Sequence, residues 1–315
     1  MMQISIYSLQ DYPSDWNEFL LKNETGTIHN TVEYARYSTS EGLDPKFVRI
    51  VDSKGNIVLQ VILFEYKHHP VKFPKLVGKI IKKINVRYKW SYGPICDSED
   101  SLQYFFNFLK KEKKKFYGLT HPFTKLCKND FKNQKWGTYL IDLKKSKEEI
   151  FQNIDKKSAR KNIERSIERG VKIEKINNNN LTEYLDLFNQ TKRESGRIAT
   201  TTEQMESFWN LLNPIGFSGF LARKDGVCIG GIMFSFFNNY MNEWGVARSK
   251  LDYEEKLYSQ DLLKWNMIEW GIENNNKWYD FSGFNPEPID PKEKGILQYK
   301  KKWGGQEYSQ WIIKN

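Results

Sequence analysis

The segment 277–283 reads KWYDFSG, and the segment 295–305 reads GILQYKKKWGG. The first segment is aromatic and apolar, as expected of a short buried strand, and it ends in a carboxylate and a glycine. The second begins at a glycine, has room for one or two helical turns, and stops at a Gly-Gly pair. The loop between them contains Pro286, Pro288 and Pro291, which cannot pair in a central sheet, so we expect it at the surface. A strand, a rigid loop and a lysine-rich helix in this order predict the edge of a cleft.

The composition suits one large domain or two modest ones. The chain has 315 residues, of which 39% are hydrophobic and 15% aromatic, so Trp, Tyr and Phe can form much of the core. Cys96, Cys127 and Cys228 are far apart and odd in number, which argues against a disulfide framework and indicates a reducing compartment. The histidines have no metal-binding spacing, so we expect no metal and no catalytic histidine.

The N-terminal residues do not read as a secretion signal, because they lack a basic start followed by a long apolar run. The longest apolar run, 227–237, is shorter than the roughly 20 residues that a membrane-spanning helix needs. We therefore expect a cytoplasmic protein.

The charge of the chain is strongly basic and unevenly distributed. The formal net charge is +10, and the segment 67–89 contains eight basic residues and no acid. This segment can be a solvated lysine-rich face, a surface that attracts RNA or a phosphorylated substrate, or a contact with an anionic membrane. No RNA-binding motif accompanies it, so charge alone does not identify a nucleic acid as the partner.

The order of predicted elements repeats once along the chain. Each half runs from a strand through helices and paired strands to another helix and strand, which predicts two α/β (α+β) domains, 1–143 and 144–315, each a mixed sheet flanked by helices. Predicted helices begin near residue 14 and cover 31–40, 100–115, 146–169, 181–194, 202–212 and 262–270. Predicted strands cover 3–9, 46–51, 57–66, 90–95, 171–176, 217–223, 227–236, 240–246, 277–281 and 308–313.

This order of elements resembles the GNAT acyltransferase fold, so we expect tandem GNAT-like domains. In that fold the pyrophosphate of acetyl-CoA binds a glycine-rich loop at a helix N-terminus. The corresponding segment here, 247–255, reads ARSKLDYEE, with no glycine and three acids. A diphosphate is poorly accommodated there, which favours a donor other than CoA.

Two such halves without the CoA loop resemble the FemABX family of aminoacyl-tRNA-dependent peptidyltransferases and its BioF2-like relatives, from about residue 31 to residue 311. The resemblance implies transfer of an aminoacyl group, typically from tRNA, to an amine of a cell-wall precursor, with no cofactor. It places the acceptor side on the first domain and the catalytic edge on the second. The motifs that carry it are YGP at 92–94, KSARKNI at 157–163, ERGV at 168–171, YDFSG at 279–283 and GILQYKKKWG at 295–304.

The resemblance also implies roles for three candidate catalytic residues. Lys300 matches the family lysine, and we expect its ammonium to stabilise negative charge on the ester carbonyl oxygen and on the departing hydroxyl. Asp280 is expected either to orient the amine or to hold the loop through backbone hydrogen bonds. Asp97 falls where the family has an acid after the Gly-Pro break, and it is the candidate base.

Further residues are candidates for substrate binding. Arg193 matches a phosphate-binding arginine of the family, and Arg197 lies four residues later, so the two are expected to share one helix face and to clamp a diphosphate, or else to form a surface pair with acids. Glu243 and Trp244 lie on a strand beside the cleft, although Trp244 also suits the core. The remaining two candidates are Tyr92 and Arg36.

A second group of basic residues is expected to contact tRNA or another polyanion, or else to be solvated helix faces. These residues are Lys156, Lys157, Arg160, Lys161, Lys301 and Lys302.

One departure from the family concerns the acceptor. Ser38 stands where a phosphate-binding lysine is expected, with Arg36 nearby, which argues against the usual UDP-linked muropeptide and leaves a phosphorylated or lipid-linked precursor, with peripheral membrane contact. No coiled-coil arm follows residue 170, so we expect a monomer. Two alternatives stay open, namely a CoA-dependent N-acyltransferase and a non-catalytic binder of RNA or anionic glycan.

Overall fold

The computed structural model describes residues 1–67 and 86–315, so most of the basic segment 67–89 lies outside the described residues. The chain forms two compact units. Unit 1 consists of Met1–Gly137 together with Ser309–Asn315, and unit 2 consists of Thr138–Tyr308. Residues 309–315, which the sequence prediction assigns to the second domain, therefore belong to unit 1.

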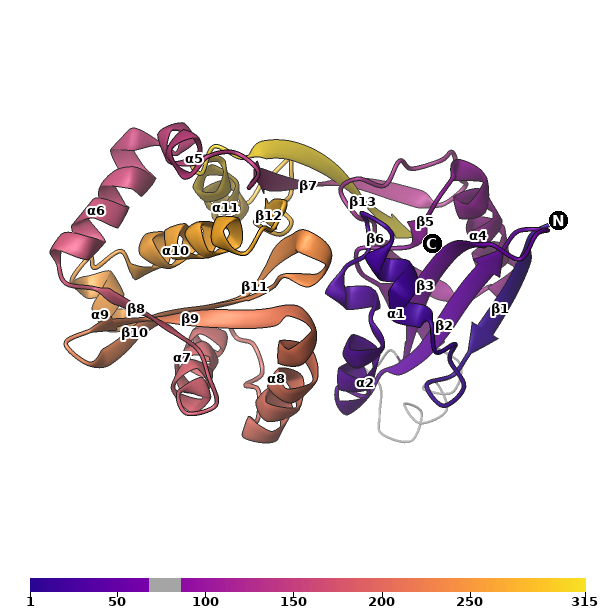
Figure 1. Ribbon diagram of the computed structural model, residues 1–315, viewed down its shortest axis with the longest axis horizontal. Helices are drawn as coiled ribbons and strands as arrows, with labels where there is room; N and C mark the ends of the chain where they lie inside the picture. Colours follow the sequence, from indigo (N-terminus) through magenta and orange to yellow (C-terminus); the bar gives the residue numbers. More distant parts are fainter. Residues whose placement is uncertain (68–85) are drawn as a thin grey trace. The chain divides into compact units, whose positions relative to one another are not determined.

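Unit 1 is a mixed sheet with helices on both faces (Figure 1). Most neighbouring strands are antiparallel, while β4 and β6 are parallel. The helix α4 (Glu99–Glu112) packs on one face, and α1 (Trp16–Leu21) and α2 (Val32–Ser40) pack on the other. The strand order is β1 (Gln3–Tyr7), β2 (Asp44–Val51), β3 (Ile57–Lys67), β4 (Val86–Trp90), β6 (Lys115–Leu119) and β13 (Gln306–Lys314, within this unit from Ser309), and β5 (Ile95–Cys96) also pairs with β3.

The helix α4 illustrates how the sequence specifies unit 1. The hydroxyl of Ser98 accepts a hydrogen bond from the backbone N–H of Ser101 and caps the helix start. Leu102, Phe105 and Phe106 follow at helical spacing and are buried against the sheet, so the helix is held by its apolar face.

The predicted strand 90–95 is wrong as a single element. The structure has β4 up to Trp90 and the short β5 from Ile95, because the chain turns between them. Tyr92 has a φ of 50°, outside the strand region, and Pro94 has no N–H to give to a sheet. The strand β6 was not predicted, since KFYGL directly follows a lysine-rich helix end.

A buried histidine lies next to this turn. His121 is completely buried, its Nδ1 accepts a hydrogen bond from the backbone N–H of Phe123 at 3.2 Å, and its ring meets the edge of Tyr92. Burial lowers the pKa of His121 to about 3, and the charge of the nearby His29 acts in the same direction.

Unit 2 is also a mixed sheet between two layers of helices (Figure 1). The strand order is β7 (Lys132–Asp142, within this unit from Thr138), β12 (Trp278–Asp280), β11 (Tyr240–Arg248), β10 (Val227–Ser235), β9 (Phe217–Lys224) and β8 (Lys172–Lys175). The helix α10 (Ser259–Glu273) lies on one face with α6 (Lys161–Glu168), and α7 (Leu181–Glu194) and α8 (Thr202–Gly216) lie on the other.

The predicted long helix 146–169 is wrong, because the structure breaks it into α5 (Lys147–Asn153), a five-residue π-helical turn (Lys156–Arg160) and α6. Ile154 has extended backbone angles and is buried in the core of unit 2, which stops α5. The Asp155 carboxylate then accepts from the backbone N–H of Ser158 and starts the helix again.

The segment after β12 also differs from its prediction. α11 (Pro291–Lys301) starts four residues before Gly295, because the Asp290 carboxylate caps the backbone N–H groups of Lys292 and Glu293. Pro291 is thus the first helical residue rather than part of a loop. The strand β7 was not predicted either, since its first half is polar.

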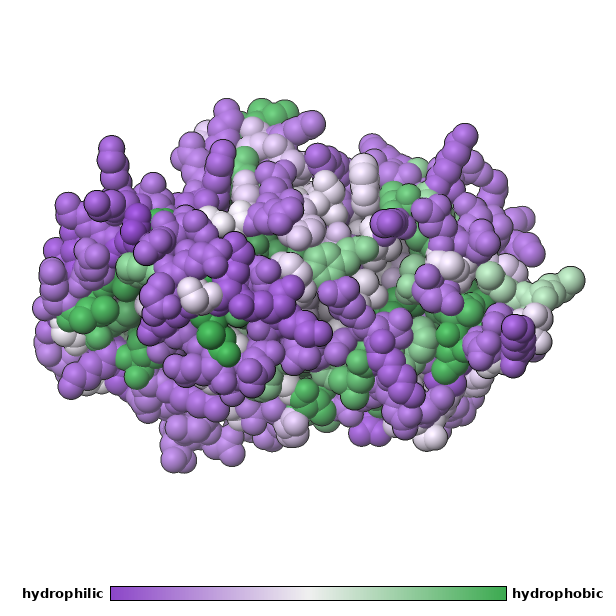
Figure 2. Space-filling view, turned by 45° about the horizontal axis from the view of Figure 1, so that its top comes forward, coloured by the Kyte–Doolittle hydropathy of each residue, from purple (hydrophilic) through white to green (hydrophobic). Residues whose placement is uncertain are grey.

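The surface shown in Figure 2 is mostly hydrophilic, with scattered apolar areas. Within residues 1–67 and 86–315, no helix is long and apolar enough to cross a membrane. The same part of the chain contains no cluster of three or more metal-binding side chains, and all three cysteines are free thiols.

We predict that His121 makes the stability of unit 1 depend on pH in the mildly acidic range. The pKa of His121 is lower in the folded state than its ordinary value near 6.5, so its contribution is complete above about pH 6.5 and decreases as the pH falls towards the folded value. The free energy of unfolding should drop by about 1.4 kcal/mol per pH unit in this window.

Urea denaturation of the wild type between pH 6.5 and 5 measures this slope. The variant His121→Asn keeps an acceptor for the Phe123 N–H but cannot titrate. The slope of its unfolding free energy against pH should therefore be smaller by about 1.4 kcal/mol per pH unit, which corresponds to one proton. Equal slopes in the two proteins would contradict the prediction.

Candidate active site

The candidate site of unit 2 begins where two strands separate. β11 and β12 are parallel and pair only from Tyr240 to Asn242 on one strand and from Trp278 to Asp280 on the other. β11 continues to Arg248, but β12 ends. Polar side chains from β11, α10 and α11 gather beyond this point.

Asp280 holds the end of β12 in place. It is completely buried, and its carboxylate accepts hydrogen bonds from the hydroxyl of Tyr240 at 2.6 Å, the amide of Asn242 at 3.1 Å and the hydroxyl of Thr138. It also accepts from the backbone N–H of Ser282 at 2.7 Å. The carboxylate therefore ties β7, β11 and the turn after β12 together.

The turn after β12 positions Lys300. Ser282 has a φ of 62°, and its hydroxyl donates to the backbone carbonyl of Glu243 at 2.6 Å. This conformation directs the carbonyl groups of Ser282 and Gly283 at the last turn of α11. The ammonium of Lys300 donates to both carbonyls at 2.8 Å. Since an ammonium has three N–H groups, two of them fix its position and one remains.

The charge of Lys300 is tuned by its surroundings. Its pKa is lowered from 10.5 to about 8, mainly by burial. The carboxylates of Glu243 and Asp280 raise the pKa, and the ammonium of Lys264 lowers it further. Lys300 is thus an ammonium at neutral pH that loses its proton more easily than an ordinary lysine.

A buried ion pair lies beside Lys300. Glu243 and Lys264 are in contact at 2.6 Å, and their side chains are only 13% and 3% exposed. The hydroxyl of Tyr279 donates to the same Glu243 oxygen at 2.8 Å, and burial together with Glu243 raises the pKa of Tyr279 well above its usual value. Tyr279 therefore stays a hydrogen-bond donor.

A second ion pair connects the end of α11 to the first turn of α10. Lys302 contacts Asp261 at 2.8 Å, and Asp261 also accepts from the Tyr299 hydroxyl at 3.2 Å and the Asn162 amide at 2.7 Å. These contacts join α6, α10 and the end of α11. They border a cavity of 420 Å³ whose lining includes three basic residues and three tyrosines, namely Arg248, Lys256, Lys302, Tyr253, Tyr258 and Tyr299.

The residues predicted to contact a polyanion lie near this end of α11. The backbone N–H of Asp155 donates to the carbonyl of Lys302 at 2.8 Å, which links the π-helical turn to α11. Lys156, Lys157, Lys161 and Lys301 are exposed. Arg160 is half-buried over the ring of Phe151, and Lys302 is engaged with Asp261.

The remaining candidates of unit 2 lie apart from this cluster. Trp244 is half-buried between Phe208 and Phe217, on the side of β11 that faces α8. Arg193 and Arg197 are exposed at the end of α7. They do not share a helix face as predicted, because α7 ends at Glu194 and Arg197 follows the positive-φ residue Gly196.

Three candidates belong to unit 1. Asp97 is exposed directly before α4 and accepts from the Ser101 hydroxyl at 3.1 Å. Tyr92 is buried and stacks on His29 at 4.9 Å. Arg36 is exposed on α2 and donates to the Tyr12 hydroxyl at 3.0 Å.

The structure adds residues that sequence reasoning missed. Lys264 and Asp261 lie three residues apart in α10, beside the apolar residues Leu262, Leu263 and Trp265, and charged residues next to this apolar stretch were the available signal. Thr138, Tyr240 and Asn242 gave no such signal, since their role depends on the pairing of strands far apart in sequence.

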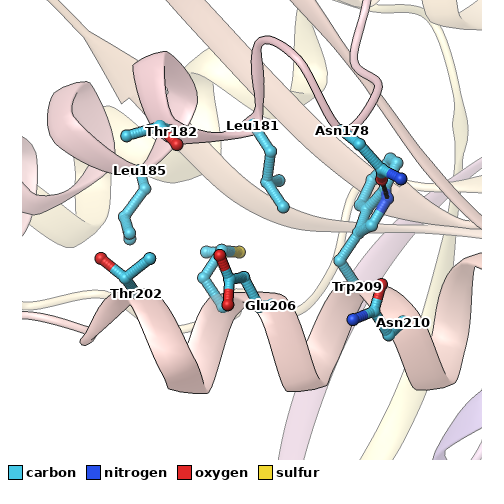
Figure 3. Close-up of a pocket in the computed structure, with 9 residues that line it drawn as sticks. Asn178, Leu181, Thr182, Leu185, Thr202, Glu206, Trp209 and Asn210 are labelled. Atoms are coloured by element: carbon cyan, nitrogen blue, oxygen red, sulfur yellow. Dashed lines mark hydrogen bonds between the residues drawn. The ribbon is translucent and has the colours of Figure 1, made fainter.

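A separate cavity of 230 Å³ lies between α7 and α8. Figure 3 shows Leu181 and Leu185 of α7 directed towards α8, and Trp209 beside Asn178 at one end. The Trp209 indole N–H donates to Asn178 at 2.9 Å. None of the candidate catalytic residues lines this cavity.

We predict that Asp280→Asn lowers the free energy of unfolding by about 3 kcal/mol. An asparagine offers one acceptor oxygen, and its NH₂ group would face groups that only donated to the carboxylate. Thermal or chemical unfolding measures the loss. Thr138→Val removes one donor and should cost less, so an equal or larger loss in that variant would contradict the central role of Asp280.

We also predict opposite shifts in the pKa of Lys300 for two variants. Lys264→Met removes a nearby cation and should raise this pKa, whereas Glu243→Gln removes a nearby anion and should lower it. NMR titration of the lysine Nζ resonance measures both shifts. Lys145→Met, at an exposed residue paired with Glu149, serves as the control and should change nothing. Shifts in the same direction in the two variants would contradict the prediction, because they would show that the charges of Lys264 and Glu243 do not control the pKa of Lys300.

This chain is similar to known proteins in its fold. No protein-family model and no curated protein matches the sequence. A crystal structure of FemX matches with a TM-score of 0.72 and 14% identity, covering 98% of this chain and 96% of that chain. The structure of L-PGS from Bacillus licheniformis matches with a TM-score of 0.56 and 11% identity, covering 96% and 91%.

A tandem GNAT protein from the clavulanic acid biosynthesis pathway matches with a TM-score of 0.52 and 10% identity, covering 100% of this chain and 98% of that chain. At these identities the matches bear on the fold. They confirm the predicted fold class. The chain has the fold of FemX and of the tandem GNAT protein, with a mixed sheet flanked by helices in each of its units.

Proposed function

We propose that the protein is an acyltransferase that moves an aminoacyl group from an aminoacyl-tRNA to an amine of a cell-envelope precursor. The observation that carries the proposal is the Lys300 ammonium, fixed by two carbonyl groups at 2.8 Å, with a pKa of about 8. A fixed cation with one remaining N–H suits a reaction that builds negative charge on a carbonyl oxygen.

The reaction requires charge stabilisation and proton transfer. The amine nitrogen attacks the ester carbonyl carbon, a C–N bond forms, and the electron pair moves to the carbonyl oxygen. Collapse of this intermediate breaks the C–O bond to the ribose, whose oxygen gains a proton while the amine loses one. Lys300 stabilises the oxyanion, and its lowered pKa suits it to protonate the leaving oxygen.

Two acids have supporting roles in this proposal. Asp280 positions Lys300 through the Ser282 turn rather than by touching substrate, because its carboxylate is buried and already accepts four hydrogen bonds. Asp97 of unit 1 remains the candidate base for the amine.

The cavity beside Lys302 supports a nucleic-acid donor. Three tyrosines lining one cavity suit an unpaired nucleotide end, whose bases stack on aromatic rings, and the exposed Lys256 beside them suits its phosphates. The exposed Lys156, Lys157, Lys161 and Lys301, with Arg160, add positive charge for the tRNA backbone. The segment 247–255 has no glycine and three acids, which argues against CoA.

The acceptor is proposed to carry phosphate. Arg36, Arg193 and Arg197 expose guanidinium groups that suit bidentate contacts with phosphate. Tyr92, Glu243 and Trp244 remain candidates for contact with the acceptor. One similar structure is named as a domain of a putative lysylphosphatidylglycerol synthetase (TM-score 0.56, 10% identity), which adds a lipid-linked precursor to the acceptors worth testing. A cytoplasmic monomer that touches the membrane surface fits this acceptor.

The proposal is tested with total tRNA charged with labelled amino acids and a panel of amine acceptors, including UDP-linked muropeptides and phospholipids. Mass spectrometry of the products identifies both the amino acid and the acceptor.

We predict that Lys300→Met lowers kcat by about 10²- to 10³-fold, the range found when one oxyanion-stabilising donor is lost. Lys292→Met removes the same charge from the exposed first turn of α11 and should retain activity. Unchanged activity in Lys300→Met would remove Lys300 from the mechanism. Transfer from an acyl-CoA rather than from tRNA would overturn the choice of donor.

A further inference from the structure

The N-terminus of α10 carries an internal anion. A helix N-terminus has exposed N–H groups and a partial positive charge, so it is a common binding site for phosphate. Here the first of these groups, the backbone N–H of Ser259, donates to Oδ1 of Asp252 at 2.8 Å. Asp252 is completely buried in the short helix α9 (Lys250–Glu254).

The second oxygen of this carboxylate is also engaged. The Nε of Arg248 donates to Oδ2 of Asp252, and the guanidinium of Arg248 lies 5.0 Å from the ring centre of Tyr253. Asp252 is therefore held between a guanidinium and a helix N-terminus, the two partners that a phosphate group would use.

The segment around Asp252 fixes this arrangement. The Ser249 hydroxyl accepts from the backbone N–H of Asp252 at 3.1 Å, and the carbonyl of Asp252 accepts from the N–H of Leu257 at 3.0 Å. Tyr258, which precedes α10, has a φ of 58° and gives no side-chain cap to the helix. The Asp252 carboxylate takes over this capping role.

We propose that Asp252 determines donor specificity by occupying the anion-binding end of α10, so that a donor held through a diphosphate, such as an acyl-CoA, is excluded. This inference rests on the proposed transfer of an acyl group at Lys300. A diphosphate at the same place would meet a buried negative charge and find Arg248 already paired. The neighbouring cavity of 420 Å³, which Arg248 and Gln260 also line, stays open to a donor bound in another way.

The test is to remove the carboxylate that occupies the helix end. Asp252→Ala frees the Ser259 N–H and releases Arg248 from its ion pair, so that both groups become available to an anion. Isothermal titration with inorganic pyrophosphate and with coenzyme A should then show binding about tenfold tighter, or more, than the wild type, and weaker at high salt.

Asp225→Asn is the matched control, because it changes the net charge equally at an exposed turn between β9 and β10. It should bind both probes as weakly as the wild type. If circular dichroism shows that Asp252→Ala does not fold, Asp252→Ser, which also removes the charge and shortens the side chain, is measured instead. A double variant that adds Arg248→Gln should lose the gain.

No gain in the folded Asp252 variant, or an equal gain in Asp225→Asn, overturns the proposal, as does saturable binding of coenzyme A by the wild type. These are binding measurements and need no transfer. Failure of aminoacyl transfer with charged tRNA would reject the proposed function and leave the role of Asp252 in anion exclusion to be decided by the titrations alone.

Discussion

The arrangement of the candidate site depends on one buried carboxylate. Asp280 can only accept hydrogen bonds when ionised, so a site that buries it must bring donors from several directions. Thr138, Tyr240 and Asn242 supply them from β7 and β11, and the N–H of Ser282 supplies a fourth. This requirement fixes the end of β12 and the turn after it, and the position of Lys300 follows from the carbonyl groups of that turn.

Sequence reasoning succeeded where the signal was local. Capping residues and apolar periodicity located α4, α7 and α8, and the KWYDFSG segment and the lysine cluster do meet, since Lys300 contacts the turn after Asp280. It failed where tertiary contacts override the local pattern. The burial of Ile154 interrupts an otherwise continuous helical stripe, and the conformation of Tyr92 divides a predicted strand. The hydrogen-bond partners of Asp280 could not be predicted from the sequence, because they depend on the register of the strands.

The charged residues of unit 2 divide into two kinds. The first kind is largely buried and ion-paired, and it consists of Glu243, Lys264, Asp252 and Asp261. Their charges organise the site, and removing the partner of any one of them would cost much free energy of folding. Lys156, Lys157, Lys161 and Lys301 are exposed, and salt would screen their interactions with any partner. Composition alone, with its net charge of +10, cannot separate these kinds, because both contribute equally to the sum.

The inclusion of most of β13 in unit 1 has a consequence for the order in which the chain acquires its structure. Ile312, Ile313 and Lys314 pair with β6, so a strand of unit 1 comes from residues that follow unit 2 in the chain. Every residue of unit 2 precedes Ser309. During synthesis unit 2 therefore has its whole sequence first, while unit 1, most of which precedes unit 2, waits with β6 unpaired on one side.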